Sequence, residues 1–334
     1  MKYKPLGRSG LIVSGLCLGT MIFGDDSGRG TDEPTAIRMI HQFLDAGGNF
    51  IDTADVYVRG YSEEITGKAL KGRRDRVVLA TKVRVRMSDD PNDVGLSRRY
   101  IIAGCEASLR RLGTDYVDLF YAHLWDPITP IEETLRAFDD LVTVGKVRYV
   151  GVSNFKAWEV MKSLGVSDSH GWARFIAAQY QYSLVVRDIE REFVPLFEAE
   201  GLGLVPWGPL GGGFLSGKYQ PGDRPTEGRI AITPDYAEEA WQRRATERNW
   251  AILDAVGEIA QAGGKSYPQV ALAWLCAQPA VVAPIIGART PEQLADNLGA
   301  VGWEFTAEEL DRLDAVSVIE EGYPYRMIRK YGAR

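Results

Sequence analysis

Short apolar runs alternate with amphipathic stretches along the whole chain of 334 residues. Eight of the apolar runs are nearly uninterrupted by polar residues. They are "LCLGT" 16–20, "NFIDT" 49–53, "VVLATK" 77–82, "VDLFYAH" 117–123, "RYVGVS" 148–153, "FIAAQY" 175–180, "LGLVPW" 202–207 and "VAPIIG" 282–287. A strand that is covered by helices on both faces loses the alternation of apolar and polar positions. The pattern therefore predicts eight buried parallel strands.

Helical periodicity separates these strands. The clearest helix is predicted from Glu33 to Ala46, because Pro34 lies in its first turn, apolar residues recur on one face, and Gly47 and Gly48 follow it. Other helices are predicted at 61–71, 97–112, 131–144, 155–164, 188–199, 239–262, 267–277 and 290–299.

Eight β/α alternations without a linker predict an α/β fold, a (β/α)8 TIM barrel that forms a single domain over residues 1–334. A doubly wound sheet with a second domain is disfavoured, because no strand–helix turn carries G-x-G-x-x-G. Residues 3–15 are expected to form a β-hairpin under the N-terminal end of the barrel. A long connection between strands seven and eight includes a polar segment, 219–238, and connections of this length are usually functional.

The chain carries a formal net charge of −6, so a nucleic-acid partner is not expected. The N-terminus has no apolar signal region, and the longest apolar run, 270–277, is too short to cross a bilayer. The three cysteines fit neither a disulfide framework nor a metal-binding spacing. We therefore expect a cytoplasmic protein without a membrane partner or a bound metal.

Polar side chains end three neighbouring strands. Asp52, Lys82 and His123 share the parity of apolar residues in their own strands, so all three are predicted to face the interior at the C-terminal end of the barrel. Lys82 is the expected partner of Asp52, because a buried carboxylate is costly when it is unpaired. Tyr57, in the loop after the second strand, can fold back over this pair.

Such a set is suited to protonating an oxyanion. The Lys82 ammonium, held charged by Asp52, would stabilise the tyrosinate that forms as Tyr57 gives up its proton. His123 would hydrogen-bond the substrate oxygen and orient it. Because these residues supply neither a nucleophile nor an electron, the reducing equivalent has to come from a cofactor.

The ends of the later strands favour a nicotinamide dinucleotide. Residues suited to a carboxamide and a flat ring are Ser153, Asn154, Gln179 and Trp207. The glycine-rich run after Trp207, together with Lys218, suits a pyrophosphate. Arg289 precedes a helix start that Thr290 is expected to cap, which is a ready phosphate site.

Six motifs together resemble the aldo-keto reductases, and the likeness extends over essentially the whole chain. They are "GGNFIDTADVY", "LATKV", "LRRLGTDYVDLFYAH", "GKVRYVGVSNF", "AAQYQYS" and "PWGPLGGGFLSGKY". The resemblance implies a (β/α)8 reductase that uses NADPH to reduce an aldehyde or ketone, with its catalytic set on Asp52, Tyr57, Lys82 and His123. It implies cofactor contacts at Thr20, Met21, Asp52, Ser153, Asn154, Gln179, Trp207, Gly208, Leu210, Gly211, Gly213, Leu215, Lys218, Gly287, Arg289, Gln293 and Asn297.

The residues expected to bind the adenosine end of the cofactor depart from the family pattern. Some members carry a Lys-Ser pair and a second arginine there, whereas this chain has Gly287, Ala288 and Arg289. Arg289 favours the 2′-phosphate of NADPH, and use of NADH is the less favoured alternative. Aromatic and apolar loop residues allow a bulky or cyclic ketone as substrate, and the candidates are Phe23, Val56, Trp125 and Tyr325.

Two other functions remain in view. A barrel aldolase would use Lys82 as a Schiff-base nucleophile, but that lysine would have to be neutral, and Asp52 beside it favours the charged form. Within the aldo-keto reductases, the chain also resembles the branch that contains the cytoplasmic β-subunits of voltage-gated potassium channels. This resemblance implies the second alternative, a regulatory module that binds NADPH.

Overall fold

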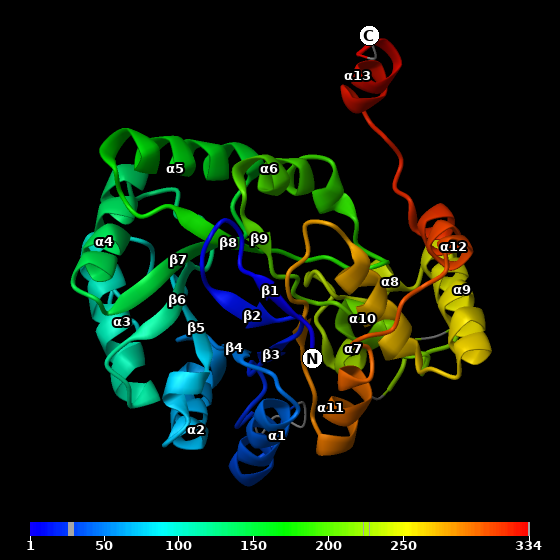
Figure 1. Cartoon of the computed structure of the whole chain (residues 1–334), viewed down its shortest axis with the longest axis horizontal. Helices are drawn as coiled ribbons and strands as arrows, with labels where there is room; N and C mark the ends of the chain where they lie inside the picture. The colour runs from blue at the N-terminus through cyan, green and yellow to red at the C-terminus, as the bar shows by residue number, and fades with distance from the viewer. Residues whose placement is uncertain (26–29, 223, 227, 333–334) are drawn as a thin grey trace.

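Eight parallel strands curl into a barrel surrounded by helices in the computed structural model, which describes residues 1–25, 30–222, 224–226 and 228–332 (Figure 1). The strands follow the order β10-β3-β4-β5-β6-β7-β8-β9. They are β3 (Cys17–Gly19), β4 (Phe50–Asp52), β5 (Val78–Val83), β6 (Val117–Ala122), β7 (Val147–Ser153), β8 (Phe175–Gln179), β9 (Gly203–Leu204) and β10 (Ile285–Ile286). All eight predicted strands and the predicted (β/α)8 class are confirmed.

The barrel closes through its two shortest strands. Leu204 of β9 forms a parallel bridge with Val281, and the amide of Ile285 in β10 donates to the carbonyl of Pro206 at 2.8 Å. On the other side, β10 pairs with β3 in the register Ile285–Cys17. These contacts pair the two outer strands of the sheet with each other, so neither presents an open edge.

The helices between the strands lie close to their predicted positions. They are α1 (Glu33–Asp45), α2 (Tyr61–Leu70), α3 (Arg98–Leu112), α4 (Ile131–Thr143), α5 (Ala157–His170), α6 (Phe193–Glu200) and α11 (Pro291–Leu298). α1 begins where Asp32 accepts a hydrogen bond from the amide of Thr35 at 2.8 Å. α5 is longer than predicted and ends at Gly171, whose left-handed backbone caps it.

The long connection after β9 holds four helices, α7 (Arg229–Ile232), α8 (Trp241–Arg244), α9 (Glu247–Gly263) and α10 (Tyr267–Ala277). The helix predicted at 239–262 is two helices, because Thr246 caps a new helix start by accepting from the amide of Asn249. Two of the positions in the predicted polar segment 219–238 lie outside the described residues. After α11 the chain forms α12 (Ala307–Ser317) and α13 (Tyr325–Tyr331).

The predicted hairpin is present as β1 (Tyr3–Pro5) and β2 (Ile12–Ser14), paired antiparallel. It lies across the barrel opening in Figure 1, which is the N-terminal end of the strands. The amide of Arg8 in its turn donates to the carbonyl of Gly201, and Leu6 and Val13 are fully buried. The hairpin therefore closes this end of the barrel.

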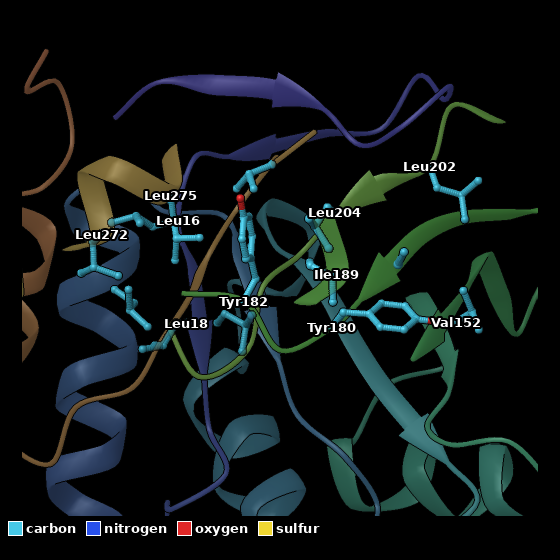
Figure 2. Packing of buried hydrophobic residues seen from close by; sticks show 14 of the residues in the cluster. Leu16, Leu18, Val152, Tyr180, Tyr182, Ile189, Leu202, Leu204, Leu272 and Leu275 are labelled. Atoms are coloured by element: carbon cyan, nitrogen blue, oxygen red, sulfur yellow. The ribbon is translucent and has the colours of Figure 1, made fainter. Parts of the chain in front are cut away.

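The core has two parts. The smaller cluster includes the inward-facing Phe50, Ala80 and Leu119, which lie below Asp52 and Lys82 in their own or a neighbouring strand. The larger cluster joins the barrel to its helices, and Figure 2 shows part of it, including Leu16 and Leu272. The inward parity predicted from the strand sequences is thus realised. No helix in the described part of the chain is both long and apolar enough to cross a bilayer.

Candidate active site

A buried ion pair lies at the C-terminal ends of β4 and β5. Nζ of Lys82 donates to Oδ1 of Asp52 at 2.5 Å and to the carbonyl of Thr53 at 2.8 Å, and both charged side chains are almost completely buried. Oδ2 of Asp52 accepts from Nε2 of the Gln179 side chain at 2.8 Å. Burial has the largest single effect on Lys82 and by itself would lower its pKa, but the charges of Asp52 and Tyr57 and the hydrogen bonds to both residues together outweigh burial and hold that pKa above its ordinary value. Lys82 is therefore an ammonium at neutral pH.

Tyr57 completes the coordination of this ammonium. Its hydroxyl accepts the third N–H of Lys82 at 3.0 Å, and Nζ lies 4.7 Å from the centre of the tyrosine ring. Burial raises the pKa of Tyr57, while the charge of Lys82 opposes that rise. Because Lys82 already donates to the phenol oxygen, the phenolic proton is directed elsewhere and can be given to a bound ligand.

His123 follows β6 and faces the same space. Its ring lies 6.2 Å from that of Tyr57 in an edge-to-face arrangement, and its amide donates to the carbonyl of Val83 at 3.1 Å. Burial, followed by the nearby charges of Lys82 and Arg84, lowers the pKa of His123 to about 3. The imidazole is therefore neutral at physiological pH and can donate one N–H to a substrate oxygen.

We expect His123 to remain neutral from pH 5 to pH 8. Its imidazole nitrogen resonances should not move over this range, and assignment follows from the signals lost in His123→Asn. Because its folded pKa is lowered, its contribution to stability is complete above the ordinary value of about 6.5 and is lost as pH falls towards 3. A His123 titration midpoint between pH 6 and 7 would contradict this geometry.

The predicted nicotinamide-binding residues also come together, but they mostly bond to one another. Nδ2 of Asn154 donates to the carbonyl of His123 at 3.0 Å and to Oγ of Ser153 at 2.9 Å. Nε1 of Trp207 donates to Oδ1 of Asn154 at 3.2 Å, which fixes the indole beside β7. Asn154 adopts a left-handed backbone with φ of 56°. Asn154 thus holds His123 and Trp207 in place through hydrogen bonds. Ser153 and Gln179 lie beside it at the ends of β7 and β8.

The glycine-rich run after Trp207 forms a tight turn. Its glycines at 208, 211, 212 and 213 all have positive φ, and Phe214 and Leu215 anchor it in the core. Leu210 is only partly buried. Nζ of Lys218 lies 3.7 Å from where a side chain on Gly213 would begin, so the lysine faces the turn. Successive left-handed glycines with a cation beside them are suited to binding a phosphate group.

The adenosine-end residues lie at the start of α11. Thr290 caps this helix by accepting from the amide of Gln293, and Oε1 of Gln293 accepts from the amide of Arg289 at 2.9 Å. Asn297 is buried and donates to the carbonyl of Gly287 at 3.1 Å. Arg289 is exposed, and burial together with the charge of Arg289 lowers the pKa of Lys218. Two cations therefore face the same region.

Two further predicted cofactor residues follow β3. The amide of Thr20 donates to the carbonyl of Asp52 at 3.0 Å, and its buried hydroxyl accepts from Ser62 at 2.8 Å. Met21 comes next and is 40% exposed, so its side chain is available to a ligand.

The substrate candidates divide into two pairs. Val56 precedes Tyr57 directly, and Trp125 packs against Phe155 with ring centres 5.0 Å apart, next to Asn154. The structure does not bring the other two to the site. Phe23 is fully buried in the larger hydrophobic cluster, so its ring is not exposed to a ligand. The hydroxyl of Tyr325 donates to Glu192, and Figure 1 shows α13 projecting away from the barrel.

Sequence reasoning missed a basic residue near Tyr57. Arg229 of α7 forms an ion pair with the buried Glu239 at 2.5 Å, and its charge is one of those that lower the pKa of Tyr57 against the effect of burial. Glu239 lies against the glycine turn, since a side chain on Gly208 would begin 3.0 Å from its Oε1. The sequence signal was only a polar segment, and nothing in its pattern shows that the segment folds back over the site.

Comparisons with known proteins agree with this geometry. The family model described as "Aldo/keto reductase family" matches residues 15–318. An uncharacterised oxidoreductase of Bacillus subtilis is 41% identical over 95% of this chain and 96% of its own length. A probable voltage-gated potassium channel β-subunit of Oryza sativa is 38% identical, with 95% and 96% covered. Versiconal hemiacetal acetate reductase of Aspergillus parasiticus is 36% identical, with 97% and 99% covered. The chain therefore belongs to the aldo/keto reductase family.

Proposed function

We propose that the protein is an NADPH-dependent reductase of aldehydes or ketones. The proposal rests mainly on the hydrogen bonds of the Lys82 ammonium. Its three N–H groups are donated to Asp52, the carbonyl of Thr53 and the hydroxyl of Tyr57. This leaves a phenolic proton beside a neutral imidazole, which is the pair of groups that a carbonyl oxygen requires as it becomes an alkoxide.

The residues present fit a dinucleotide. Lys218 and Arg289 are close enough for the charge of Arg289 to lower the pKa of Lys218, and an anionic phosphate would relieve their repulsion. The left-handed glycines beside Lys218 open the backbone to such a group. We propose that Trp207, Ser153 and Gln179 hold the nicotinamide end, with Met21 and Thr20 bordering it. Reduced nicotinamide, when bound, supplies the hydride.

The protein's own residues then act on the carbonyl oxygen. His123 donates its N–H to this oxygen and orients it, because the ring is neutral and braced through the Asn154 contact to its carbonyl. Tyr57 donates the proton as negative charge develops on the oxygen. Lys82 stabilises the tyrosinate that remains, and Asp52 keeps Lys82 charged throughout. Val56 and Trp125 border the position that we assign to the substrate.

A carbonyl screen tests the reaction. Purified protein is mixed with aliphatic, aromatic and cyclic aldehydes and ketones, with NADPH or NADH, and the loss of absorbance of the reduced nicotinamide is followed. We expect turnover of several compounds with NADPH. A protein that binds NADPH tightly but turns over none of them would contradict the reductase proposal and favour a regulatory module.

Arg289→Ala is expected to weaken NADPH binding roughly 10- to 100-fold, because one charge-assisted hydrogen bond to a phosphate is worth about 1.5–3 kcal/mol. NADH binding should change by less than about twofold, since NADH has no 2′-phosphate. Equilibrium titration by quenching of the tryptophan fluorescence measures both constants. Equal losses of affinity for NADPH and NADH would show that Arg289 does not bind the 2′-phosphate.

A regulatory NADPH-binding subunit is the second candidate, because three of the similar proteins are named as probable or putative voltage-gated potassium channel β-subunits. The Schiff-base aldolase is less well supported. Lys82 is protonated and bonded to three acceptors, whereas a Schiff-base nucleophile needs a free lone pair. Borohydride treatment with a carbonyl substrate should therefore leave Lys82 unmodified.

A further inference from the structure

Asp55 lies in the turn between β4 and Tyr57 and has no role in the chemistry described above. It is 1% exposed, and neither carboxylate oxygen has a hydrogen bond of regular geometry to the residues that the structure describes, although the neighbouring Val56 amide acts on the carboxylate. Its own amide donates to the carbonyl of Lys82 at 3.3 Å. A charged carboxylate buried in this way would be strongly destabilising unless another group compensated it.

The charged groups around Asp55 are already engaged with one another. Glu63 of α2 is fully buried and accepts from Oγ1 of Thr81 at 2.5 Å and from Nε of Arg111 of α3 at 2.6 Å. Tyr100, also on α3, donates its hydroxyl to the carbonyl of Val85 at 3.0 Å. Lys82 of β5 is held by its three acceptors. Each of the two cations near Asp55 among the described residues, Arg111 of α3 and Lys82 of β5, is therefore already bonded to other groups.

The balance of these neighbours keeps a proton on Asp55. Burial first, and the charge of Glu63 second, raise the pKa of Asp55 to about 8, against smaller opposing effects of the Val56 amide, Arg111 and Lys82. Glu63, by contrast, has two hydrogen-bond donors for its charge. At neutral pH Asp55 is therefore a neutral carboxyl group next to the Glu63–Arg111 ion pair.

The turn that carries Tyr57 rests directly on this cluster. Val58 and Arg59 have left-handed backbones, with φ of 47° and 55°, and Gly60 follows with φ of 94°. A side chain on Gly60 would begin 2.6 Å from Cδ of Arg111, so the arginine that pairs with Glu63 lies immediately under the turn. A displacement of Arg111 therefore moves the support of Tyr57.

We propose that Asp55 is a positioning residue for Tyr57. While neutral, it allows the turn 54–60 to rest on the Glu63–Arg111 pair, and when it releases its proton to solvent at alkaline pH it competes with Glu63 for Arg111 and displaces the turn. Tyr57 then loses its place at Lys82. The kinetic part of this inference rests on the proposed reductase function, and its structural part does not.

Asp55→Asn, which stays neutral at every pH, tests the kinetic part. In the wild-type protein, turnover should fall roughly fivefold between pH 8 and pH 9, as expected for one group with a pKa of about 8. In Asp55→Asn this decrease should disappear, while turnover at pH 7 stays within about threefold of wild type. Asp115→Asn, at an exposed position, should keep the wild-type profile. An unchanged alkaline decrease in Asp55→Asn would overturn the proposal.

The structural part is tested on the wild-type protein without any substrate. Hydrogen–deuterium exchange of peptides covering 54–60, corrected for the intrinsic effect of pH, should accelerate between pH 7 and pH 9, while peptides from β6 and β7 should not. Unchanged protection of 54–60 would overturn the proposal even if the protein proved inactive. Accelerated exchange in a protein without reductase activity would instead refute the proposed function alone.

Thermal unfolding tests independently whether the proton on Asp55 stabilises the folded protein. Because the folded pKa of Asp55 is raised from 3.8 to about 8, the stability contributed by its proton is complete at low pH and is lost as pH rises through about 8. The difference in melting temperature, Asp55→Asn minus wild type, should therefore grow from pH 4 to pH 8 and stay constant above it. A constant difference across the whole range would refute a titrating Asp55.

Discussion

Tyr57→Phe is expected to lower the rate of carbonyl reduction by about 10²- to 10⁴-fold, which is the usual contribution of a positioned general acid. The substitution removes the hydroxyl that accepts a hydrogen bond from Lys82 and leaves the ring in place. NADPH binding should change by less than about threefold, because the phenol acts in the transition state and not in cofactor binding. Single-turnover absorbance and fluorescence titration measure the two quantities separately.

Tyr61→Phe provides the matched control. It removes a phenolic hydroxyl four residues later, and that hydroxyl donates to Glu33 at 2.7 Å instead of contacting Lys82. Turnover of this variant should stay within about twofold of wild type, as for most surface substitutions. If Tyr57→Phe retained wild-type turnover, Tyr57 would lose its assignment as the proton donor.

Lys82→Met is expected to abolish measurable turnover, with a loss of about 10³-fold or more, and also to lower the free energy of unfolding by about 3–5 kcal/mol. The methionine cannot stabilise the tyrosinate. It also leaves the Asp52 carboxylate buried with Gln179 as its remaining side-chain donor. Single-turnover assays and urea denaturation at pH 7 measure the two effects.

The double variant Asp52→Asn/Lys82→Met separates stability from chemistry. Replacing both members of a buried ion pair by neutral groups of similar shape is often nearly neutral, so most of the lost stability should return. Turnover should not return, because the cation that stabilises the tyrosinate is still missing. A double variant that regained wild-type turnover would show that the Lys82 charge is not needed for the reaction.

The barrel and the contacts of Lys82 with Asp52 and Tyr57 could be predicted from sequence for a clear physical reason. Strands covered on both faces are continuously apolar, so a carboxylate or ammonium at the end of such a strand stands out. The period of two along a strand then placed Asp52 and Lys82 on the inner face, where the structure has them paired. Local helix signals were less uniform: Thr290 caps α11 as predicted, whereas the single helix predicted at 239–262 is two helices.

What sequence could not show depends on how distant segments fold together. Phe23 follows a strand just as Met21 does, yet Phe23 is fully buried in the core whereas Met21 is 40% exposed. Asp55 looked like part of a motif, but its isolation comes from α2 and α3 packing around it. Arg229 reaches the neighbourhood of Tyr57 only because the segment after β9 returns over the barrel. None of these contacts is encoded by local periodicity.

The pairing of β10 with β3, each of which contributes two residues, also affects how the barrel folds during translation. Cys17 of β3 pairs with Ile285 of β10, so the first strand of the barrel to leave the ribosome waits for a partner that is 268 positions further along (285 − 17). At about 5–20 residues per second this delay is on the order of 10 to 60 s. During translation the nascent sheet therefore exposes the unpaired side of β3, and chaperone capture would be most useful in that interval.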